Sequence, residues 1–550
     1  MNQTLSQGRL LGQIRFSGTL KIASDTTKNT MFCRLIFVLA LAQLWESSQT
    51  AKILVVVPMP WKSHHYVFQT IMKELANKGH SIDYLTPIPI ENPPSNVRHL
   101  MIRDSFAETI GSIDVEELDP FWCPEEYLMW RTMNLKYLSE LYRNEPKIKE
   151  LLKSEEKYDV VMSECNNLQE INCIWAHRFN ALSINVLALG DLLFANEMSG
   201  LPSNPSYMVD APVHLTDVMT FPERLWSTLQ YAVNLPLHYH QVWEYQKLAD
   251  ETMRYPGWEG RPPLSMLAAD QALVLVNSHP AVGYAYPKAP QVKEIGGMTL
   301  SGSTALPKDL KTFMDNSPEG VIYFSLGSAV DMNKLTKRGK LNDFLNMFRG
   351  LKQKVLLKWM GDSLPDVGDS KILIKNWFPQ LGILAHKNTK LFVTHGGLQS
   401  LMEAVHFGVP VVSIPIFGDQ HKNTKFLVSR GLGVELNKRN LTRESMLWAI
   451  TEVTENPIYK ETVERRSAIL RDVPPMGQVQ EAAYWVEYVL KHGRVLQPAS
   501  VHMPFYQVYL LDVAAFLVAT LVATYFIIVF TLRRICRMLF TKNKQKNKKE

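Results

Sequence analysis

The sequence predicts an α/β protein of two doubly wound units, each a parallel sheet between helices, followed by one membrane-spanning helix. Strand-helix-strand openings after Ile53 and after Gly320 predict the two sheets, and an uncharged apolar run over residues 513–532 predicts the span. The length agrees, because 550 residues exceed what one hydrophobic core usually serves. With 46% apolar and 20% charged residues, the composition is that of a globular protein rather than a disordered one.

The first unit opens on Ile53–Val57 (ILVVV), a continuous apolar strand of the kind that is buried in a parallel sheet. A helical pattern follows from about Tyr66 to Lys78 and ends at Gly79, before a second strand that reads SIDYLTP. We expect this unit to occupy residues 52–270.

The second unit, expected over residues 271–475, opens on Gly320–Leu326 (GVIYFSL). Further strand candidates follow at Lys354–Lys358, Lys371–Lys375 and Lys390–Thr394. In doubly wound sheets, ligands bind at the carboxyl ends of the strands. The two units are therefore expected to face each other across one cleft.

The apolar run Val513–Leu532 has twenty residues without a charge. At 1.5 Å per residue its length matches a hydrocarbon core of about 30 Å. A buried helix of a soluble protein is the alternative, but the basic cluster that follows is typical of a cytosolic exit. Residues 476–512 are expected to form a helix and a juxtamembrane segment before the span.

The net charge of +6 does not indicate a nucleic-acid partner, because it comes from the last segment of the chain. Residues 533–550 carry eight basic residues and one acidic residue, which leaves the rest of the chain near −1. We expect this basic tail to be cytosolic. Its Lys546 and Lys548 resemble the dilysine retrieval signal of endoplasmic reticulum membrane proteins.

The N-terminal region predicts secretion. Residues 1–30 form a polar extension, and residues 31–51 have the layout of a signal peptide, with a basic residue, a short apolar run and then small residues. The sequence therefore predicts a single-pass type I protein of the endoplasmic reticulum membrane with both units in the lumen. The three lumenal cysteines, Cys123, Cys165 and Cys173, are an odd number, and their spacing matches no metal site.

A polar set lies at the strand ends of the second unit. One strand ends at Thr394, so His395, Gly396 and Gly397 occupy the turn into the next helix. Backbone N–H groups and the helix dipole favour a phosphate at such a turn. Glu403, further along that helix, can accept the hydroxyls of a ribose.

The next strand delivers Asp419 and Gln420 to the same edge, where an acid and an amide can bind vicinal hydroxyls of a sugar. Upstream, Trp377 offers a flat ring for a base and Gln380 an amide for its edge. The set therefore predicts a nucleotide-sugar site. No Asp-x-Asp motif, with which many nucleotide-sugar enzymes hold a divalent ion, occurs in the chain, so we expect neither a metal nor another cofactor.

The stretch Trp377–Gln420, with WFPQ, THGG and PVVSIPIFGDQ, strongly resembles the signature of the UDP-glycosyltransferases, a membrane-bound animal family, and is most like its insect members. Gly320–Ser328 (GVIYFSLGS) and Leu511-Asp512 resemble further landmarks, so the resemblance covers nearly the whole mature chain. It implies a GT-B fold with an N-terminal acceptor-binding unit, a C-terminal UDP-sugar-binding unit and no metal.

The resemblance also implies roles for single residues. It places Trp377 on uracil, Gln380 and Glu403 on the uridine, His395 with Gly396 and Gly397 on the diphosphate, and Asp419 and Gln420 on the sugar. Ser325, Gln399 and Ser400 complete the implied donor set, although vertebrate members commonly have Asn-Gly at the last two positions.

After the first strand the chain reads PMPWKSHHYVFQ, and Ser63-His64 resembles the family's Ser-His at the start of the first helix. An imidazole with a pKa near 6.5 can take a proton from an acceptor hydroxyl. The helix N-terminus is expected to favour its neutral form. His65 is the rival base and is otherwise expected to be a solvated helix residue.

A carboxylate that orients the base is expected at the end of a strand, which in the family reads F-D-V-x-L-x-D. Here the run is Tyr158–Glu164 (YDVVMSE), which presents Glu164, one methylene longer than aspartate, as the partner of His64. Asp159, at the start of the strand, is expected to be a solvated turn residue.

The expected activity is an inverting transfer of a hexosyl group from a UDP-sugar to a hydroxyl of a small lipophilic acceptor. The segment Met101–Tyr245, rich in aromatic and methionine residues, is expected to hold the acceptor. UDP-glucose is the favoured donor; a glucuronosyltransferase and a catalytically silent lumenal binding protein are the alternatives.

Asn440 begins an N-x-T glycosylation sequon, although its Thr442 also fits a helix N-cap. The sequence leaves the oligomeric state open.

Overall fold

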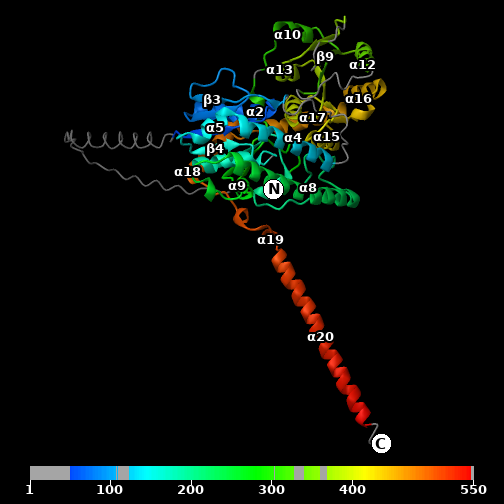
Figure 1. Cartoon of the computed structure of the whole chain (residues 1–550). Coiled ribbons are helices and arrows are strands. Elements are labelled where there is room, and N and C mark those ends of the chain that lie inside the picture. The colour runs from blue at the N-terminus through cyan, green and yellow to red at the C-terminus, as the bar shows by residue number, and fades with distance from the viewer. Residues whose placement is uncertain are drawn as a thin grey trace, which may run out of the picture. The chain divides into compact units, whose positions relative to one another are not determined.

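The computed structural model describes residues 50–546, apart from 107, 109–122, 167, 303, 328–339, 360–363 and 365–367. The predicted N-terminal extension, nearly all of the predicted signal peptide and the last four residues lie outside this part of the chain. The described residues form two parallel sheets with helices on both faces and a long C-terminal helix (Figure 1).

The first unit is a seven-stranded parallel sheet in the order β3-β2-β1-β4-β5-β6-β7. Its strands are β1 (Lys52–Val56), β2 (Ser81–Thr86), β3 (Val97–Met101), β4 (Val160–Ser163), β5 (Leu182–Leu187), β6 (Leu273–Val276) and β7 (Val292–Glu294). The sequence order reverses at β1, which pairs with β2 on one side and with β4 on the other. The ends of β1 and β4 form a switch point, where α/β sheets open a crevice for ligands.

The apolar run of β1 is explained by burial on both faces of the sheet. Leu54 and Val56 share a core with α4 (Cys123–Asn144) and α8 (Phe221–Thr252). Ile53 and Val55 share the opposite core with α2 (Lys62–Asn77) and α18 (Gln478–His492), so the last helix before the juxtamembrane segment packs back onto the first unit.

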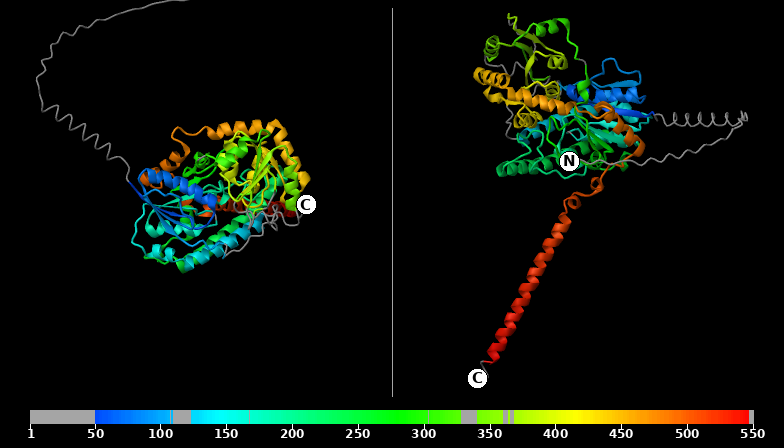
Figure 2. Two further views of the ribbon diagram at one scale, coloured as in Figure 1. Left: turned by 90° about the horizontal axis from the view of Figure 1, so that it is seen from above. Right: turned by 180° about the vertical axis from the view of Figure 1, so that it is seen from behind.

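The second unit is a six-stranded parallel sheet in the order β10-β9-β8-β11-β12-β13. Its strands are β8 (Val321–Ser325), β9 (Lys354–Lys358), β10 (Ile372–Lys375), β11 (Thr389–Thr394), β12 (Val411–Ser413) and β13 (Gly433–Glu435). One face carries α10 (Lys308–Asp315), α13 (Gln380–Ala385), α14 (Leu398–His406), α15 (Gln420–Ser429) and α17 (Pro457–Arg471), and the other α12 (Lys340–Arg349) and α16 (Arg443–Glu455). Figure 2 shows the two units side by side, the first mostly blue to green and the second mostly yellow to orange.

The predicted strands of both units are present within one or two residues, and the first predicted helix begins at Lys62 rather than at Tyr66. The division between the sheets lies later in the chain than the expected 270/271 boundary. Strand β6 pairs with β5, and β7 pairs with β6, so the first sheet continues to Glu294. The remaining helices are α5 (Pro146–Lys153), α6 (Ile174–Phe179), α7 (Leu193–Met198), α9 (Leu264–Ala269) and α19 (Phe505–Val508).

The C-terminal helix α20 (Leu511–Lys546) contains the predicted apolar run. Its segment Leu511–Thr541 is long and apolar enough to cross a membrane, and its most apolar window is not buried against the rest of the protein. A soluble core helix would be covered by other elements. The exposure of α20 therefore argues against the alternative of a buried helix.

Candidate active site

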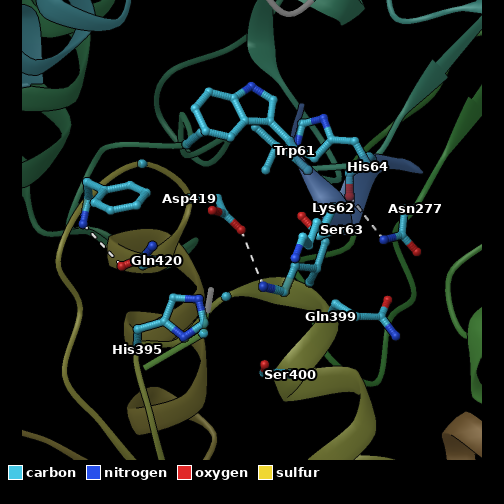
Figure 3. Close-up of a pocket in the computed structure, with 18 of the residues that line it drawn as sticks. Trp61, Lys62, Ser63, His64, Asn277, His395, Gln399, Ser400, Asp419 and Gln420 are labelled. Carbon is cyan, nitrogen blue, oxygen red and sulfur yellow. Dashed lines mark hydrogen bonds between the residues drawn. The ribbon is translucent and has the colours of Figure 1, made fainter. Parts of the chain in front are cut away.

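A cavity of about 910 Å³ lies at the carboxyl ends of the two sheets and is lined from both units. Its volume is within the range of ~300–1,000 Å³ that is usual for ligand sites. Figure 3 shows His64 from the first unit and Asp419 from the second on opposite sides of this cavity.

His64 lines the cavity and is held by a buried carboxylate. Its Nδ1 lies 2.6 Å from Oε2 of Glu164, and both side chains are buried. Glu164 also accepts hydrogen bonds from Nε2 of Gln169 (3.0 Å) and from the Ala188 N–H (3.4 Å). The extra methylene of Glu164 is therefore accommodated, and the longer carboxylate reaches the imidazole directly.

Burial lowers the pKa of His64, but the charge of Glu164, its hydrogen bond and the charge of Asp419 outweigh burial, so the net pKa is raised above 6.5. This direction is opposite to the one expected from the helix N-terminus alone, because a carboxylate in contact acts more strongly than the helix dipole. The arrangement makes His64 a stronger base.

The structure corrects the expectation for His65, which is buried rather than solvated. Its Nε2–H donates to the Met59 carbonyl (2.7 Å), and its Nδ1 accepts from the Tyr84 hydroxyl. Burial is the main cause that lowers its pKa to about 4. With both nitrogens engaged in the core, His65 has a structural role. Asp159, by contrast, is exposed as expected and accepts from the Lys52 N–H.

The predicted phosphate turn lies between β11 and α14. Gly396 has a φ of 82°, and a Cβ there would meet the hydroxyl oxygens of Thr424 and Ser413 at 2.6 and 2.7 Å. A Cβ on Gly397 would meet Nε2 of His395 at 2.6 Å. Both positions therefore need glycine. Burial and the charge of Lys358 lower the pKa of His395 to about 4, so its ring is a neutral hydrogen-bonding group at the turn.

The predicted uridine residues form one hydrogen-bonded network. Glu403 is buried and accepts from Nε2 of Gln380 (2.7 Å) and from Nε2 of Gln399 (3.0 Å). Gln380 also donates to the Ser400 hydroxyl (3.2 Å). Trp377 lines the same cavity with 68% of its surface exposed, which leaves its ring free for stacking.

The predicted sugar residues are both buried and both line the cavity. Oδ2 of Asp419 accepts from Nδ2 of Asn423 (2.6 Å) and from the Leu398 N–H (3.4 Å). Oε1 of Gln420 accepts from the N–H groups of Ile416 (2.8 Å) and Phe417 (3.1 Å). These bonds fix the loop at residues 416–420 and orient both side chains.

Glu126 and Lys358 are among the cavity residues that the sequence analysis did not single out. Glu126, on α4 of the first unit, accepts from the Gly418 N–H of the second unit and from Nε1 of Trp130 (3.1 Å). Lys358, at the end of β9, places its Nζ 5.1 Å from the ring centroid of Trp377. A lysine that ends an apolar strand was a usable signal for an anion site, whereas nothing in the local sequence marks Glu126.

Other predicted residues lie away from the cavity. Ser325 is buried behind it, and its hydroxyl accepts from the Gly327 N–H (3.4 Å). Asn440 is exposed, and Thr442 is the N-cap of α16, accepting from the Ser445 N–H (3.1 Å). Within the described ranges, no group of three or more His, Cys, Asp or Glu side chains is placed to hold a metal ion.

Comparison with known proteins agrees with this geometry. The family model described as UDP-glucoronosyl and UDP-glucosyl transferase matches residues 51–547. The UDP-glycosyltransferase UGT5 of Dactylopius coccus is 33% identical over 89% of this chain and 93% of its own length. The UDP-glucuronosyltransferase 2B33 of Macaca mulatta is 28% identical over 94% of this chain and 98% of its own length.

Among solved structures, the calicheamicin glycosyltransferase CalG4 matches 81% of this chain and all of its own, with a TM-score of 0.54 and 19% identity. This likeness shows a shared fold, the GT-B type of two Rossmann-like units. The family match spans almost the whole chain and includes both units of the site. The chain is therefore a UDP-glycosyltransferase, a member of the UDP-glucoronosyl and UDP-glucosyl transferase family.

Proposed function

We propose that this enzyme transfers a hexosyl group, glucose in preference to glucuronate, from a UDP-sugar to a hydroxyl of a small lipophilic acceptor. His64 is the base, and the anomeric configuration inverts. One observation carries this proposal: His64, held by the buried Glu164, lines the same cavity as Trp377, the His395 turn and Asp419. A base and a donor set on opposite walls are what a direct displacement needs.

In the proposed reaction, Nε2 of His64 takes the proton of the acceptor hydroxyl, because Nδ1 is held by Glu164. The hydroxyl oxygen bonds to the anomeric carbon while the bond from that carbon to the β-phosphate oxygen breaks, and UDP leaves. Attack from the side opposite to the leaving group inverts the configuration. The Glu164 carboxylate stabilises the imidazolium that forms.

Charge that develops on the β-phosphate needs fixed donors or cations nearby. The turn at His395 leads into the N-terminus of α14, and Lys358 is close enough to His395 to depress the pKa of that histidine. The N–H groups of the turn, the neutral imidazole and the Lys358 ammonium are therefore proposed to stabilise the leaving UDP. No step in this scheme requires a metal ion.

The preference for glucose is supported by the charges at the sugar end of the cavity. Asp419 and Glu126 are carboxyl groups there, and Glu126 bonds to the residue before Asp419. Among the described cavity residues the only cations of fixed charge are Lys62 and Lys358, and Lys358 lies over the base-binding Trp377. Burial raises the pKa of both carboxyl groups, and a glucuronate carboxylate beside them would be desolvated with no further cation on the described walls of the cavity to pair with, which disfavours it.

We further propose that α20 anchors the enzyme in the endoplasmic reticulum membrane, with both units in the lumen. The apolar segment Leu511–Thr541 and the basic residues after Leu532 support this orientation. Protease added to sealed microsomes should then remove only the tail. Recovery of fragments of either unit from intact vesicles would show the opposite orientation.

The proposed reaction can be tested with microsomes that carry the enzyme, radiolabelled UDP-glucose or UDP-glucuronate, and a panel of phenols. Labelled glucoside should form from UDP-glucose, with inverted anomeric configuration, and should be absent with the His64→Ala variant. If the protein binds UDP but neither transfers sugar to any acceptor nor hydrolyses any donor, the silent binding protein would be favoured instead.

A further inference from the structure

In the first six turns of α8, most buried side chains are polar and many exposed side chains are apolar. Its exposed positions include Arg224, Thr228 and His240, but seven of them carry large apolar side chains: Phe221 (69% exposed), Leu225 (50%), Trp226 (38%), Leu229 (52%), Val233 (45%), Tyr239 (40%) and Trp243 (55%). Its buried positions up to residue 241 all carry polar side chains (Ser227, Gln230, Asn234, His238 and Gln241), and from Val242 onward the buried side chains are apolar. A surface helix of a soluble protein shows the opposite pattern.

The exposed residues form a continuous stripe. Phe221, Leu225, Leu229 and Val233 follow one another at intervals of four residues, so each lies one turn above the last. Single apolar residues on a surface are ordinary, but a contiguous apolar stripe marks a surface that contacts a protein or a membrane. We call residues 221, 225, 229 and 233 the α8 stripe.

The rotation of α8 is fixed by its inner face. His238 lines the cavity, its Nδ1 lies 3.2 Å from the Tyr127 hydroxyl, and its ring stacks on Phe194 at a centroid distance of 4.4 Å. Further along, the hydroxyl of Tyr245 donates to the Leu168 carbonyl (2.6 Å). These contacts hold the polar face inward, so the α8 stripe stays outward in the folded enzyme.

Helix α8 is also linked to the segment just before the apolar helix. The hydroxyls of Tyr231, on α8, and of Tyr509 both donate to the carboxylate of Glu197, at 2.8 Å for Tyr509. Tyr509 stands two residues before α20 begins at Leu511. In Figures 1 and 2, α8 runs along the side of the enzyme from which α19 and α20 depart.

We propose that the α8 stripe lies in the interfacial layer of the bilayer that α20 crosses. This inference rests on the proposed anchoring by α20, which keeps α8 beside the membrane and raises its effective concentration there. An apolar helix face with tryptophan and tyrosine at its edges, such as Trp226, Tyr239 and Trp243, suits the boundary between headgroups and acyl chains. Because its inner face lines the cavity, α8 is then the wall between the bilayer and the acceptor side of the site.

The test uses the full chain with its exposed native cysteine removed by Cys536→Ser, one copy per nanodisc of phosphatidylcholine, and a bimane fluorophore on a single introduced cysteine. Leu229→Cys places the probe on the α8 stripe. Leu447→Cys is the matched control, because Leu447 is a similarly exposed leucine (40%) on α16 of the second unit. Leu521→Cys, within α20, reports on anchoring. Each protein is compared in plain and in brominated lipid, whose bromine atoms quench fluorophores that contact acyl chains.

Brominated lipid should quench the probes at positions 229 and 521 but not the probe at 447. Adding Leu225→Glu and Val233→Glu should abolish quenching at 229 and leave it unchanged at 521, because charged side chains leave the apolar layer. A probe at 229 that behaves like the one at 447, while 521 is quenched, would overturn the inference and leave the anchor intact. Quenching absent at 521 would overturn the anchor itself. In nanodiscs loaded with two copies, crosslinking of the cysteine at 229 to the second copy, without bromine quenching, would identify the α8 stripe as a protein interface instead.

Discussion

Nδ1 of His64 lies 2.6 Å from Oε2 of Glu164, and this contact joins the helix after β1 to the loop after β4. If His64 is the base, His64→Ala should lower kcat by roughly 10²- to 10⁴-fold, the usual contribution of general-base catalysis. The affinity for UDP, measured by calorimetry, should stay within a few fold, because His64 belongs to the opposite wall. A variant with near-normal kcat would exclude His64 as the base.

Glu164→Asp tests whether the site is built around the longer carboxylate. Shortening the side chain by one methylene should pull its oxygen out of reach of His64 and lower kcat about tenfold, equivalent to roughly 1.4 kcal/mol. Asp159→Asn, at the exposed start of the same strand, is the control and should change little. Equal activity of Glu164→Asp and the parent enzyme would mean that the 2.6 Å contact is not needed.

The donor residues should divide base recognition from sugar recognition. Trp377→Ala should weaken UDP itself, because stacking of a base on an aromatic ring contributes on the order of 1–3 kcal/mol. Asp419→Asn should abolish transfer yet leave UDP binding within a few fold. Calorimetry with UDP and a transfer assay separate the two effects. Equal losses of UDP affinity in both variants would contradict this division.

Glu126 gives a fourth prediction, because it reaches from α4 across the cavity to the loop that carries Asp419. Glu126→Ala removes the acceptor of the Gly418 N–H and of Trp130 Nε1. Hydrogen bonds to charged groups contribute roughly 1.5–3 kcal/mol, so the KM for the UDP-sugar should rise about tenfold or more. Glu125→Ala, its exposed neighbour, should leave KM unchanged. Similar KM values for the two variants would remove Glu126 from the site.

The sheets could be predicted because buried parallel strands are continuous apolar runs, and β9 has the predicted bounds Lys354–Lys358. The His64–Glu164 contact, and the gathering of most predicted donor residues at one cavity, could be predicted from motifs that stand at strand ends. The first sheet continues past the expected 270/271 boundary, because β6 pairs with β5, and the sheet to which a strand belongs is a long-range contact that no local pattern marks.

When two adjacent residues of a helix are of the same type, the local sequence does not show which of them faces the cavity, because the rotation of the helix about its axis determines this. Glu125 is exposed, whereas Glu126 is buried and contacts the second unit at the cavity. Nothing in the local sequence distinguishes the two. The same holds for His64 and His65, one at the cavity and one in the core. Packing of α4 on α8 and of α2 on α18 sets these phases, and such long-range contacts leave no local pattern. In the first six turns of α8 the usual rule fails, since many apolar residues there are exposed and most buried residues are polar.

The most direct test of the account is the pH dependence of kcat/KM in the parent enzyme and in Glu164→Gln. A base must be deprotonated to act, so activity falls as pH drops through the pKa of His64 in the free enzyme. Glu164 is the main influence that raises this pKa above 6.5. The acid limb of the parent profile should therefore have its midpoint above pH 6.5, and Glu164→Gln should move it to lower pH and lower the plateau, because the imidazolium loses its counter-charge. Superimposable acid limbs in the two enzymes would contradict the assignment of Glu164 as the partner of a His64 base.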